Sequence, residues 1–330
     1  MLGHERRDVN LPVDLLVSVL GRVLSIAAFL GLGVTLANLA VEFGAVDAIA
    51  RFARPLTRPA NLPDEVGTAI LATTASPTAG YGMLAEFREA GTLDDRATLV
   101  AVTVNTFFGF AQHIFTFYAP VLIPILGLEV GLLYVGSRAA ISLAITLTGV
   151  AAGALLLSSD NVDPDVMPSD VASDGGEEAS KTRREKVTDA LASTKDKILD
   201  ILPRLLVVYT LVAVVTETTD LTAVTGVAEP VTSLIGLPGA AAAVIAVFAI
   251  DTTSGALVIA PMLDDVFTPQ TAVATMLVGG IVSFAVSTFK RSIPFQFGIW
   301  GAEFGTKVVV VNTVLKVVFI AVALVVLLVP

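Results

Sequence analysis

Two short polar segments interrupt otherwise apolar sequence and contain the residues best suited to bind a solute. The first reads Thr73-Thr74-Ala-Ser76-Pro77-Thr78-Ala-Gly80, and the second reads Asp251-Thr252-Thr253-Ser254-Gly255. Hydroxyl groups donate and accept hydrogen bonds, and free helix ends offer backbone amides and carbonyls, so both segments suit a sugar or the edge of a base. A single hydroxyl is weak evidence, because Ser and Thr often bond to their own helix. The candidate substrate-binding residues are Thr74, Ser76, Thr78, Asn105, Gln112, Asp251, Thr253 and Ser254.

Asp251 is the strongest single candidate for a functional residue. An acid that directly follows the apolar run Ala240–Ile250 is unfavourable in lipid, which favours a functional role. Its carboxylate could bind a coupling cation, Na⁺ or H⁺, or accept hydrogen bonds from the solute. The structural alternative is that it caps a helix through the amide of Thr253 or Ser254.

Three other ionisable residues are candidates for coupling: His113, Glu129 and Glu303. His113 ends a predicted interruption, Gly109-Phe-Ala-Gln-His113, in the segment from Ala97 to about Leu126, where Pro120 and Pro124 follow and the pattern predicts a broken helix. Its imidazole could titrate during transport, although such a histidine is more often simply hydrogen-bonded. Each Glu lies in a Gly-x-Glu-x-Gly sequence at the predicted start of a span. A structural interpretation is favoured there, because glycines four apart let helices approach closely and a first-turn Glu favours the helix dipole.

Two basic residues of the second half, Lys290 and Arg291, lie near the positions that Asn105, Gln112 and His113 hold in the first half. They could attract an anionic group, or their long side chains could extend to the cytoplasmic edge of the membrane. The sequence supports both interpretations equally.

The composition indicates an integral membrane protein. Hydrophobic residues make up 55% of the chain and charged residues 15%, unlike an average soluble domain. Apolar runs such as Leu15–Leu39, Ile141–Leu157 and Val308–Val329 reach or approach the length that crosses a bilayer. The first run is too long for a typical signal peptide, so it is expected to stay as the first span.

The chain contains an internal repeat. Pro55 is followed 175 positions later by Pro230, and Gly80 by Gly255 at the same spacing. The Glu129 motif recurs 174 positions later at Glu303. Two membrane-embedded repeats are the usual plan of secondary transporters.

Length and charge predict how each half crosses the membrane. The apolar piece Leu62–Phe87 is shorter than the about forty residues that two crossings need, so it either crosses once or re-enters. Re-entry gives three crossings per half and an inverted second half. All the main basic clusters then share one face, which the excess of Lys and Arg marks as cytoplasmic, with both termini outside. These clusters are Arg51, Arg54 and Arg58; Arg88 and Arg96; Lys290, Arg291 and Lys307; and the linker bases, whereas Arg6 and Arg7 do not fit.

The predicted fold is therefore an all-α integral membrane protein with two inverted-topology repeats, each with about three spanning helices and a re-entrant helical hairpin. Residues 1–157 form the first repeat, 158–197 an acidic cytoplasmic linker, partly disordered, and 198–330 the second repeat. The net charge of −10 and the acidic linker suggest a halophilic source. Without cysteine the chain has no disulfide, thiolate metal site or thiol nucleophile.

The polar segments also carry a family resemblance. The run Thr73–Glu86, its partner Asp251–Leu263 and the repeat frame resemble the nucleoside recognition, or Gate, membrane domain family, which is distantly similar to concentrative nucleoside transporters. The resemblance covers about Val41–Leu157 and Thr216–Val329. It implies a re-entrant hairpin followed by a broken helix in each half, with the solute between hairpin tips and breaks. The chain lacks the extra scaffold helices of full nucleoside transporters, and an oligomer is expected in their place.

The leading hypothesis is a secondary transporter of a small polar solute, a nucleoside being one candidate, coupled to Na⁺ or H⁺. The alternative is a non-transporting Gate-type scaffold module that binds partner membrane proteins. The expected partners are membrane lipid, the solute and a second copy of the chain, with no nucleic acid. No enzymatic activity, metal or cofactor other than the coupling ion is expected, because the sequence contains no nucleotide-binding loop and no zinc-protease motif.

Overall fold

The computed structural model describes residues 54–163, 232–287 and 292–329, with scattered positions from 17 to 35 and from 166 to 214. Most of the predicted first span and of the linker lies outside the described residues, as do Lys290 and Arg291. The predictions made for those segments therefore stay predictions.

Regular secondary structure in the described part of the chain is entirely helical, which confirms the all-α class. The first half contains short helices at both ends, a helical hairpin, an irregular long helix and a straight long helix: α3 Arg54–Thr57, η1 Arg58–Ala60, α4 Asp64–Ala75, α5 Pro77–Glu89, α6 Asp95–Val104, α7 Thr106–His113, the π-helix η2 Ile114–Leu122, α8 Ile123–Leu126, α9 Leu128–Leu156 and η3 Ser159–Asn161. The second half contains α12 Ala241–Ile250, α13 Thr252–Ile259, η5 Ala260–Met262, α14 Pro269–Ser287 and α15 Ile293–Leu328.

Three helical segments are long and apolar enough to cross a membrane: Asp95–Leu126, Leu128–Leu156 and Phe295–Leu328. The shortest of them has 29 residues and, at about 1.5 Å per residue, exceeds the about 30 Å of a hydrocarbon core. The membrane assignment drawn from composition is therefore supported by the lengths of folded helices.

The two halves bend at repeat-related positions. Ser76 (φ −143°, ψ 111°) and Asp251 (φ −147°, ψ 123°) are extended residues between the two arms of a helical hairpin. Gly127 (φ 79°, ψ 169°) and Gly301 (φ 72°, ψ 168°) form a sharp bend before a long apolar helix. Because φ is positive at both glycines, a side chain there would be strained. The sequence repeat is therefore also a repeat of backbone conformation.

One predicted irregularity lies elsewhere. The expected interruption at Gly109–His113 is wrong, because these residues continue the regular helix α7. The chain departs from α-helical geometry on either side, at Asn105 and in the π-helix that contains Pro120, one of the two prolines expected to break this segment. Proline lacks an amide hydrogen, and the wider turns of a π-helix let the helical path continue through it.

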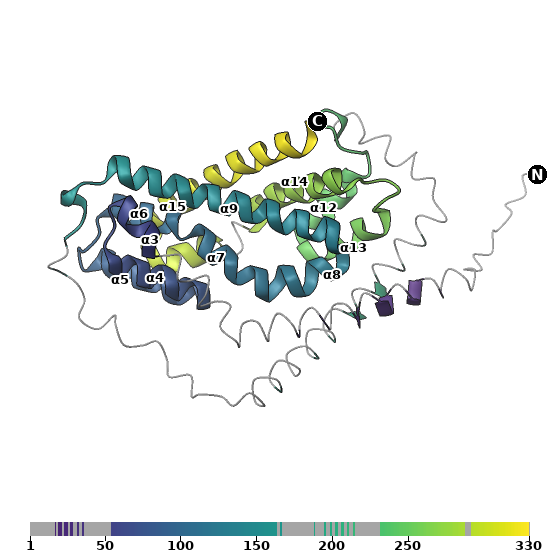
Figure 1. Cartoon of the computed structure of the whole chain (residues 1–330), viewed down its shortest axis with the longest axis horizontal. Helices are drawn as coiled ribbons and strands as arrows, with labels where there is room; N and C mark the ends of the chain where they lie inside the picture. The colour runs from purple at the N-terminus through teal and green to yellow at the C-terminus, as the bar shows by residue number, and fades with distance from the viewer. Residues whose placement is uncertain are drawn as a thin grey trace, which may run out of the picture.

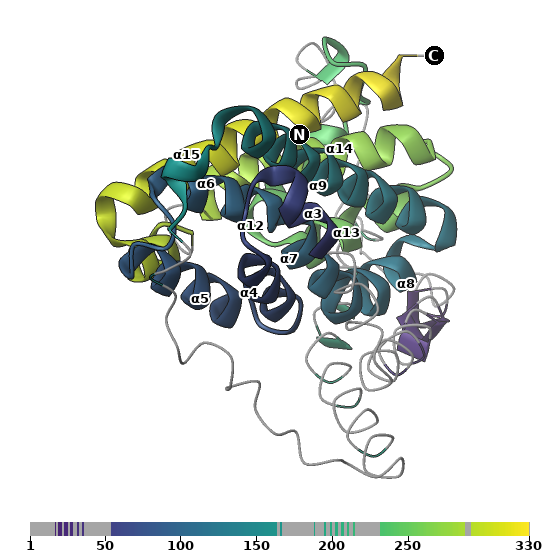
Figure 2. The ribbon, with the colours of Figure 1, turned by 60° about the vertical axis from the view of Figure 1, so that its left-hand side comes forward.

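Each hairpin packs against a long helix of the other half. The Tyr81 ring of α5 contacts Phe295 and Trp300 of α15, at centroid distances of 5.8 and 6.2 Å. The Phe248 ring of α12 contacts Tyr134 of α9 at 6.5 Å. Figure 1 shows the first hairpin and the second at opposite ends of the molecule, and Figure 2 shows α4 and α5 side by side. The two halves therefore share two hydrophobic cores and form one structure.

Both ends of the first hairpin lie at the same end of α9. Before the hairpin, the Asn61 side chain donates a hydrogen bond to the Leu157 carbonyl at 3.2 Å. After the hairpin, the Asp94 amide donates to the Asn161 carbonyl at 3.1 Å. The chain therefore enters and leaves α4 and α5 beside the end of α9 that leads into the linker.

Candidate functional site

A fully buried polar pair joins the first hairpin to the irregular helix of the same half. Asn105 lies between α6 and α7, and its Nδ2 donates a hydrogen bond to the Thr73 hydroxyl at 2.9 Å. The same hydroxyl donates to the Ala69 carbonyl at 3.1 Å. Thr73 is 0% exposed and Asn105 is 1% exposed. The Asn105 Oδ1 is buried and accepts no hydrogen bond, which is unfavourable for an isolated carbonyl and marks it as a candidate ligand for a solute donor.

The backbone at Asn105 is satisfied from α9. The Thr146 hydroxyl donates to the Val104 carbonyl at 2.9 Å and accepts from the Phe107 amide at 3.0 Å. Thr146 therefore holds the irregular turn in place without help from the Asn105 side chain. Sequence reasoning missed Thr146, although a stripe of small and hydroxyl residues at helical spacing indicated the closely packed face of this span. The stripe comprises Ser142, Thr146, Gly149 and Gly153, all of which are buried.

The second half replaces this polar pair with an aromatic ring. Phe248 lies 175 positions after Thr73, and Gly279 lies 174 positions after Asn105. A Cβ atom at Gly279 would meet the Phe248 Cβ at 3.0 Å, and one at Gly255 would meet the Phe248 Cα at 2.6 Å. The ring thus occupies the space between hairpin and long helix, and the buried polar pair belongs to the first half only.

The hydroxyls of the first hairpin tip are used by their own helices. Thr74 is buried, and its hydroxyl donates to the Leu71 carbonyl. Ser76 is the N-cap of α5, and its hydroxyl accepts from the Ala79 amide at 3.3 Å. Thr78, two residues further along, is exposed. The structural interpretation therefore accounts for Thr74 and Ser76, whereas Thr78 faces outward.

Asp251 caps the second arm of the other hairpin. Its carboxylate accepts from the Ser254 amide at 2.7 Å, which is the capping geometry considered as the alternative role. Thr253 is 6% exposed and Ser254 is half-buried. A negative charge at a helix N-terminus is favourable, so the cap explains how an acid is tolerated here.

Gln112 and His113 lie two turns beyond Asn105. Seven or eight helical residues correspond to about 10–12 Å along the axis, so the structure does not group them with the Thr73–Asn105 pair. Gln112 is half-buried and His113 is exposed. Gln112 and His113 end α7 directly before the π-helix, whereas Asn105 precedes α7, so the three residues border two different irregular points of the chain.

The Gly-x-Glu-x-Gly sequences build the two sharp bends. At the second glycine of each motif, a Cβ atom would collide with the preceding turn: at Gly131 it would meet the Ile123 Cα at 2.8 Å, and at Gly305 the Phe297 Cδ1 at 2.8 Å. Glu129 is exposed in the first turn of α9. The second glycine of each motif therefore allows close packing at a sharp bend, and the coupling role of Glu129 stays a prediction.

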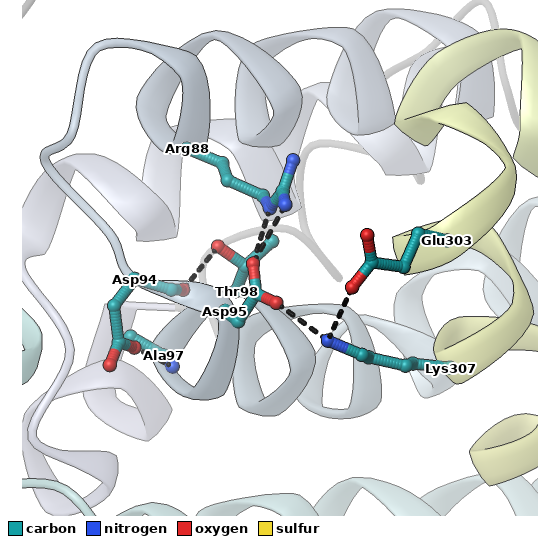
Figure 3. Close-up of polar contacts among 7 residues, drawn as sticks. All are labelled: Arg88, Asp94, Asp95, Ala97, Thr98, Glu303 and Lys307. Carbon is teal, nitrogen blue, oxygen red and sulfur yellow. Dashed lines mark hydrogen bonds and ion pairs between the residues drawn. The ribbon is translucent and has the colours of Figure 1, made fainter.

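Glu303 belongs to a surface ion network that links the halves (Figure 3). Asp95, at the start of α6, pairs with Arg88 at 2.7 Å and with Lys307 of α15 at 2.9 Å. Glu303 lies 3.8 Å from Lys307, and its side chain is 92% exposed. Glu303 is thus at the surface of this network rather than in the buried polar region.

The chain is similar to two archaeal proteins. Uncharacterized protein MJ0871 of Methanocaldococcus jannaschii is 26% identical over 280 residues, which cover 84% of each chain. Uncharacterized protein MJ0880 of the same organism is 28% identical over 107 residues, 32% of this chain and 34% of its own. No protein-family profile and no solved structure matches the chain. The functional argument therefore starts from the geometry of the chain itself.

Proposed function

We propose that this chain is a secondary transporter of a small polar solute, with nucleosides as the first class to test, coupled to Na⁺ or H⁺. The observation that carries the proposal is the buried Asn105 Oδ1, which accepts no hydrogen bond beneath the first helical hairpin. A hydroxyl, amino or amide group of a solute would supply the missing donor.

The packing supports a re-entrant hairpin. The arms α4 and α5 have 12 and 13 residues, and at about 1.5 Å per residue each is well short of the about 30 Å of hydrocarbon. Both ends of this hairpin lie beside the same end of α9. A hairpin that begins and ends at one face of the membrane fits both facts.

The packing also supports an inverted repeat. Asn161, just after α9, bonds to Asp94, while Lys307, close to the start of the long arm of α15, bonds to Asp95. The repeat-related helices α9 and α15 therefore run in opposite directions, as Figure 1 also shows. Arg88 and Lys307 meet at one carboxylate, which fits basic clusters that share the cytoplasmic face.

Access to the site requires movement. Thr73 and Asn105 are closed to solvent, and a Cβ atom at Gly80 would collide with Thr73 and the Ala69 carbonyl. The hairpin arms are therefore in direct backbone contact. A solute reaches Asn105 when the hairpin and α7 separate, which is the type of gating motion that alternating access uses.

The test is uptake of radiolabelled nucleosides into proteoliposomes under imposed Na⁺ and H⁺ gradients. Wild-type uptake is expected to depend on one gradient and to be lost in Asn105→Leu. Thr148→Val is the control, since it removes only an intrahelical hydroxyl contact to the Ala144 carbonyl. Gradient-independent equilibration, or full uptake by Asn105→Leu, would count against the proposal.

The scaffold alternative has a specific observation in its favour. The hydroxyls of Thr74 and Ser76 and the carboxylate of Asp251 all bond to their own hairpin helices. Only 11% of the most apolar 18-residue stretch of α15 is buried, so this helix offers a long apolar face to lipid, to a partner or to a second copy. A chain that binds no solute in a thermal-shift screen but forms a defined oligomer in lipid would support the scaffold.

A further inference from the structure

Two basic residues interrupt the most apolar helices far from their ends. Arg138 lies ten residues after the first residue of α9, and Lys316 lies fifteen residues after the bend at Gly301 in α15. At about 1.5 Å per residue, these positions are about 15 Å and 22 Å into their helices. Lys316 also has twelve residues, about 18 Å, between it and the end of α15. Neither lies at a helix end, where extension to the membrane surface is the ordinary explanation.

The two cations meet at one aromatic ring. The Arg138 guanidinium carbon is 5.9 Å from the centre of the Phe284 ring, and the Lys316 ammonium nitrogen is 4.9 Å from the same centre. His113 of α7 lies within electrostatic range of both cations. Four separate helices, α7, α9, α14 and α15, therefore bring cationic or aromatic groups to one place.

Two tyrosines of the first half, Tyr118 and Tyr134, lie beside this group of cations and rings. Tyr118 and Tyr134 pack with ring centres 6.0 Å apart, and the Tyr118 hydroxyl lies near Arg138. Neutral hydroxyls can donate to an anion as well as accept from a cation. The cluster thus combines a planar guanidinium, an ammonium group and phenolic donors.

The cluster lacks a compensating negative charge among the described residues. The ion pairs in this part of the chain involve Arg58, Arg88 and Lys307, and none reaches Arg138 or Lys316. The Arg138 Nε is buried without a hydrogen-bond partner. An aromatic face attracts a cation but does not neutralise it, and two like charges in a medium of low dielectric constant repel strongly. Both side chains are half-buried, and a cation within a membrane-spanning helix is normally paired, so these two cations favour a bound anion.

We propose that Arg138 and Lys316 bind a small oxyanion, a carboxylate or phosphate group of a diffusible solute, between α9, α14 and α15. The guanidinium offers two parallel N–H donors to such a group, and the ammonium supplies a point charge. His113 and the Tyr118 hydroxyl border this oxyanion site. The site is a binding claim that is separate from Asn105, and it holds whether or not the chain transports a nucleoside. An anionic lipid headgroup has the same chemistry and is the competing source.

The test is thermal unfolding of the full chain in nanodiscs of phosphatidylcholine, titrated with sodium phosphate or sodium acetate at fixed ionic strength. At least one of these anions is expected to raise the unfolding midpoint saturably in the wild type. Arg138→Gln and Lys316→Gln are expected to weaken half-saturation at least tenfold, whereas Lys316→Arg keeps the response. Lys307→Gln is the matched control, since it removes a cation of the same helix that is already paired.

A second measurement separates binding from a structural role. Without added anion, Arg138→Met and Lys316→Met are expected to unfold at or above the wild-type temperature, because each removes one of two repelling charges. Failure of both Met variants to fold, or a lower midpoint in each, would show that the cations are paired within the fold and would overturn the proposal. The proposal would also be overturned if anions did not raise the unfolding midpoint of the wild type saturably. An anion response in the Gln variants equal to that of the wild type would overturn it as well. Loss of the response in discs that contain phosphatidylglycerol would assign the site to lipid instead of a solute.

Discussion

Replacing Asn105 by leucine separates the two possible roles of this residue. The change removes the hydrogen bond to Thr73, which contributes about 1 kcal/mol to stability. It also removes the buried Oδ1 that accepts nothing, which relieves about 1–3 kcal/mol of desolvation. Leucine is similar in size, and the Thr73 hydroxyl keeps the Ala69 carbonyl as a partner. The net expectation is a change between zero and about 2 kcal/mol in favour of the folded state.

The assay for this substitution pairs stability with uptake. Thermal unfolding in nanodiscs, followed by the fluorescence of Trp300, the only tryptophan, is expected to show an unchanged or higher midpoint for Asn105→Leu. Uptake in proteoliposomes is expected to be lost. Such a gain in stability with a loss of function is typical of a residue kept for binding rather than for folding.

Thr146→Val supplies the opposite case. It leaves the Val104 carbonyl and the Phe107 amide unpaired in a buried turn, so it is expected to destabilise the chain by about 1–3 kcal/mol. If Asn105→Leu destabilised the chain as much as Thr146→Val does, Asn105 would be a structural residue and the reasoning from its unpaired oxygen would be refuted.

Three other experiments test the hairpins. Asp251→Asn keeps a good N-cap and removes the charge, so an unchanged midpoint with weakened cation dependence of uptake is expected; full cation-dependent uptake would remove Asp251 from the coupling. Gly80→Ala is expected to destabilise by about 1–3 kcal/mol in thermal unfolding, because its Cβ would collide with α4, whereas Gly82→Ala, which meets nothing within 4 Å, is expected to be neutral or stabilising. Single cysteines at Arg58 and Glu89, in a chain that has none, are expected to react with an impermeant reagent from the same side; labelling from opposite sides would exclude a re-entrant hairpin.

Much of the backbone could be predicted from residue types alone. The predicted segments Leu62–Phe87 and Ala97–Leu126 correspond to the hairpin Asp64–Glu89 and to the span Asp95–Leu126. Proline, glycine and apolar length are local signals, and they set these boundaries. The Gly109–His113 interruption was misplaced, because a glycine in a helix gives no sign of whether neighbouring helices support it.

The contacts of the candidate site depended on the fold. Asn105 was identified from the sequence, but its bond to Thr73 and its unpaired oxygen required the packing of α4 on α7. Thr74 and Ser76 have the same side-chain chemistry as Thr73, yet they bond within their hairpin. Arg138 and Lys316 were not identified from the sequence, and only the fold shows that they share a ring.

In the second half, Phe248 and Gly279 stand at the positions that Thr73 and Asn105 hold in the first half. This difference limits the number of polar sites that the two repeats can form. Two repeats of this kind would offer two equivalent sites, but the phenyl ring of Phe248 fills one of them. If the proposed solute binds at the other, each polypeptide would carry one solute molecule per transport cycle. Its inward-facing and outward-facing states, which a pseudo-two-fold axis would relate in backbone, would then differ in energy even when no solute is bound.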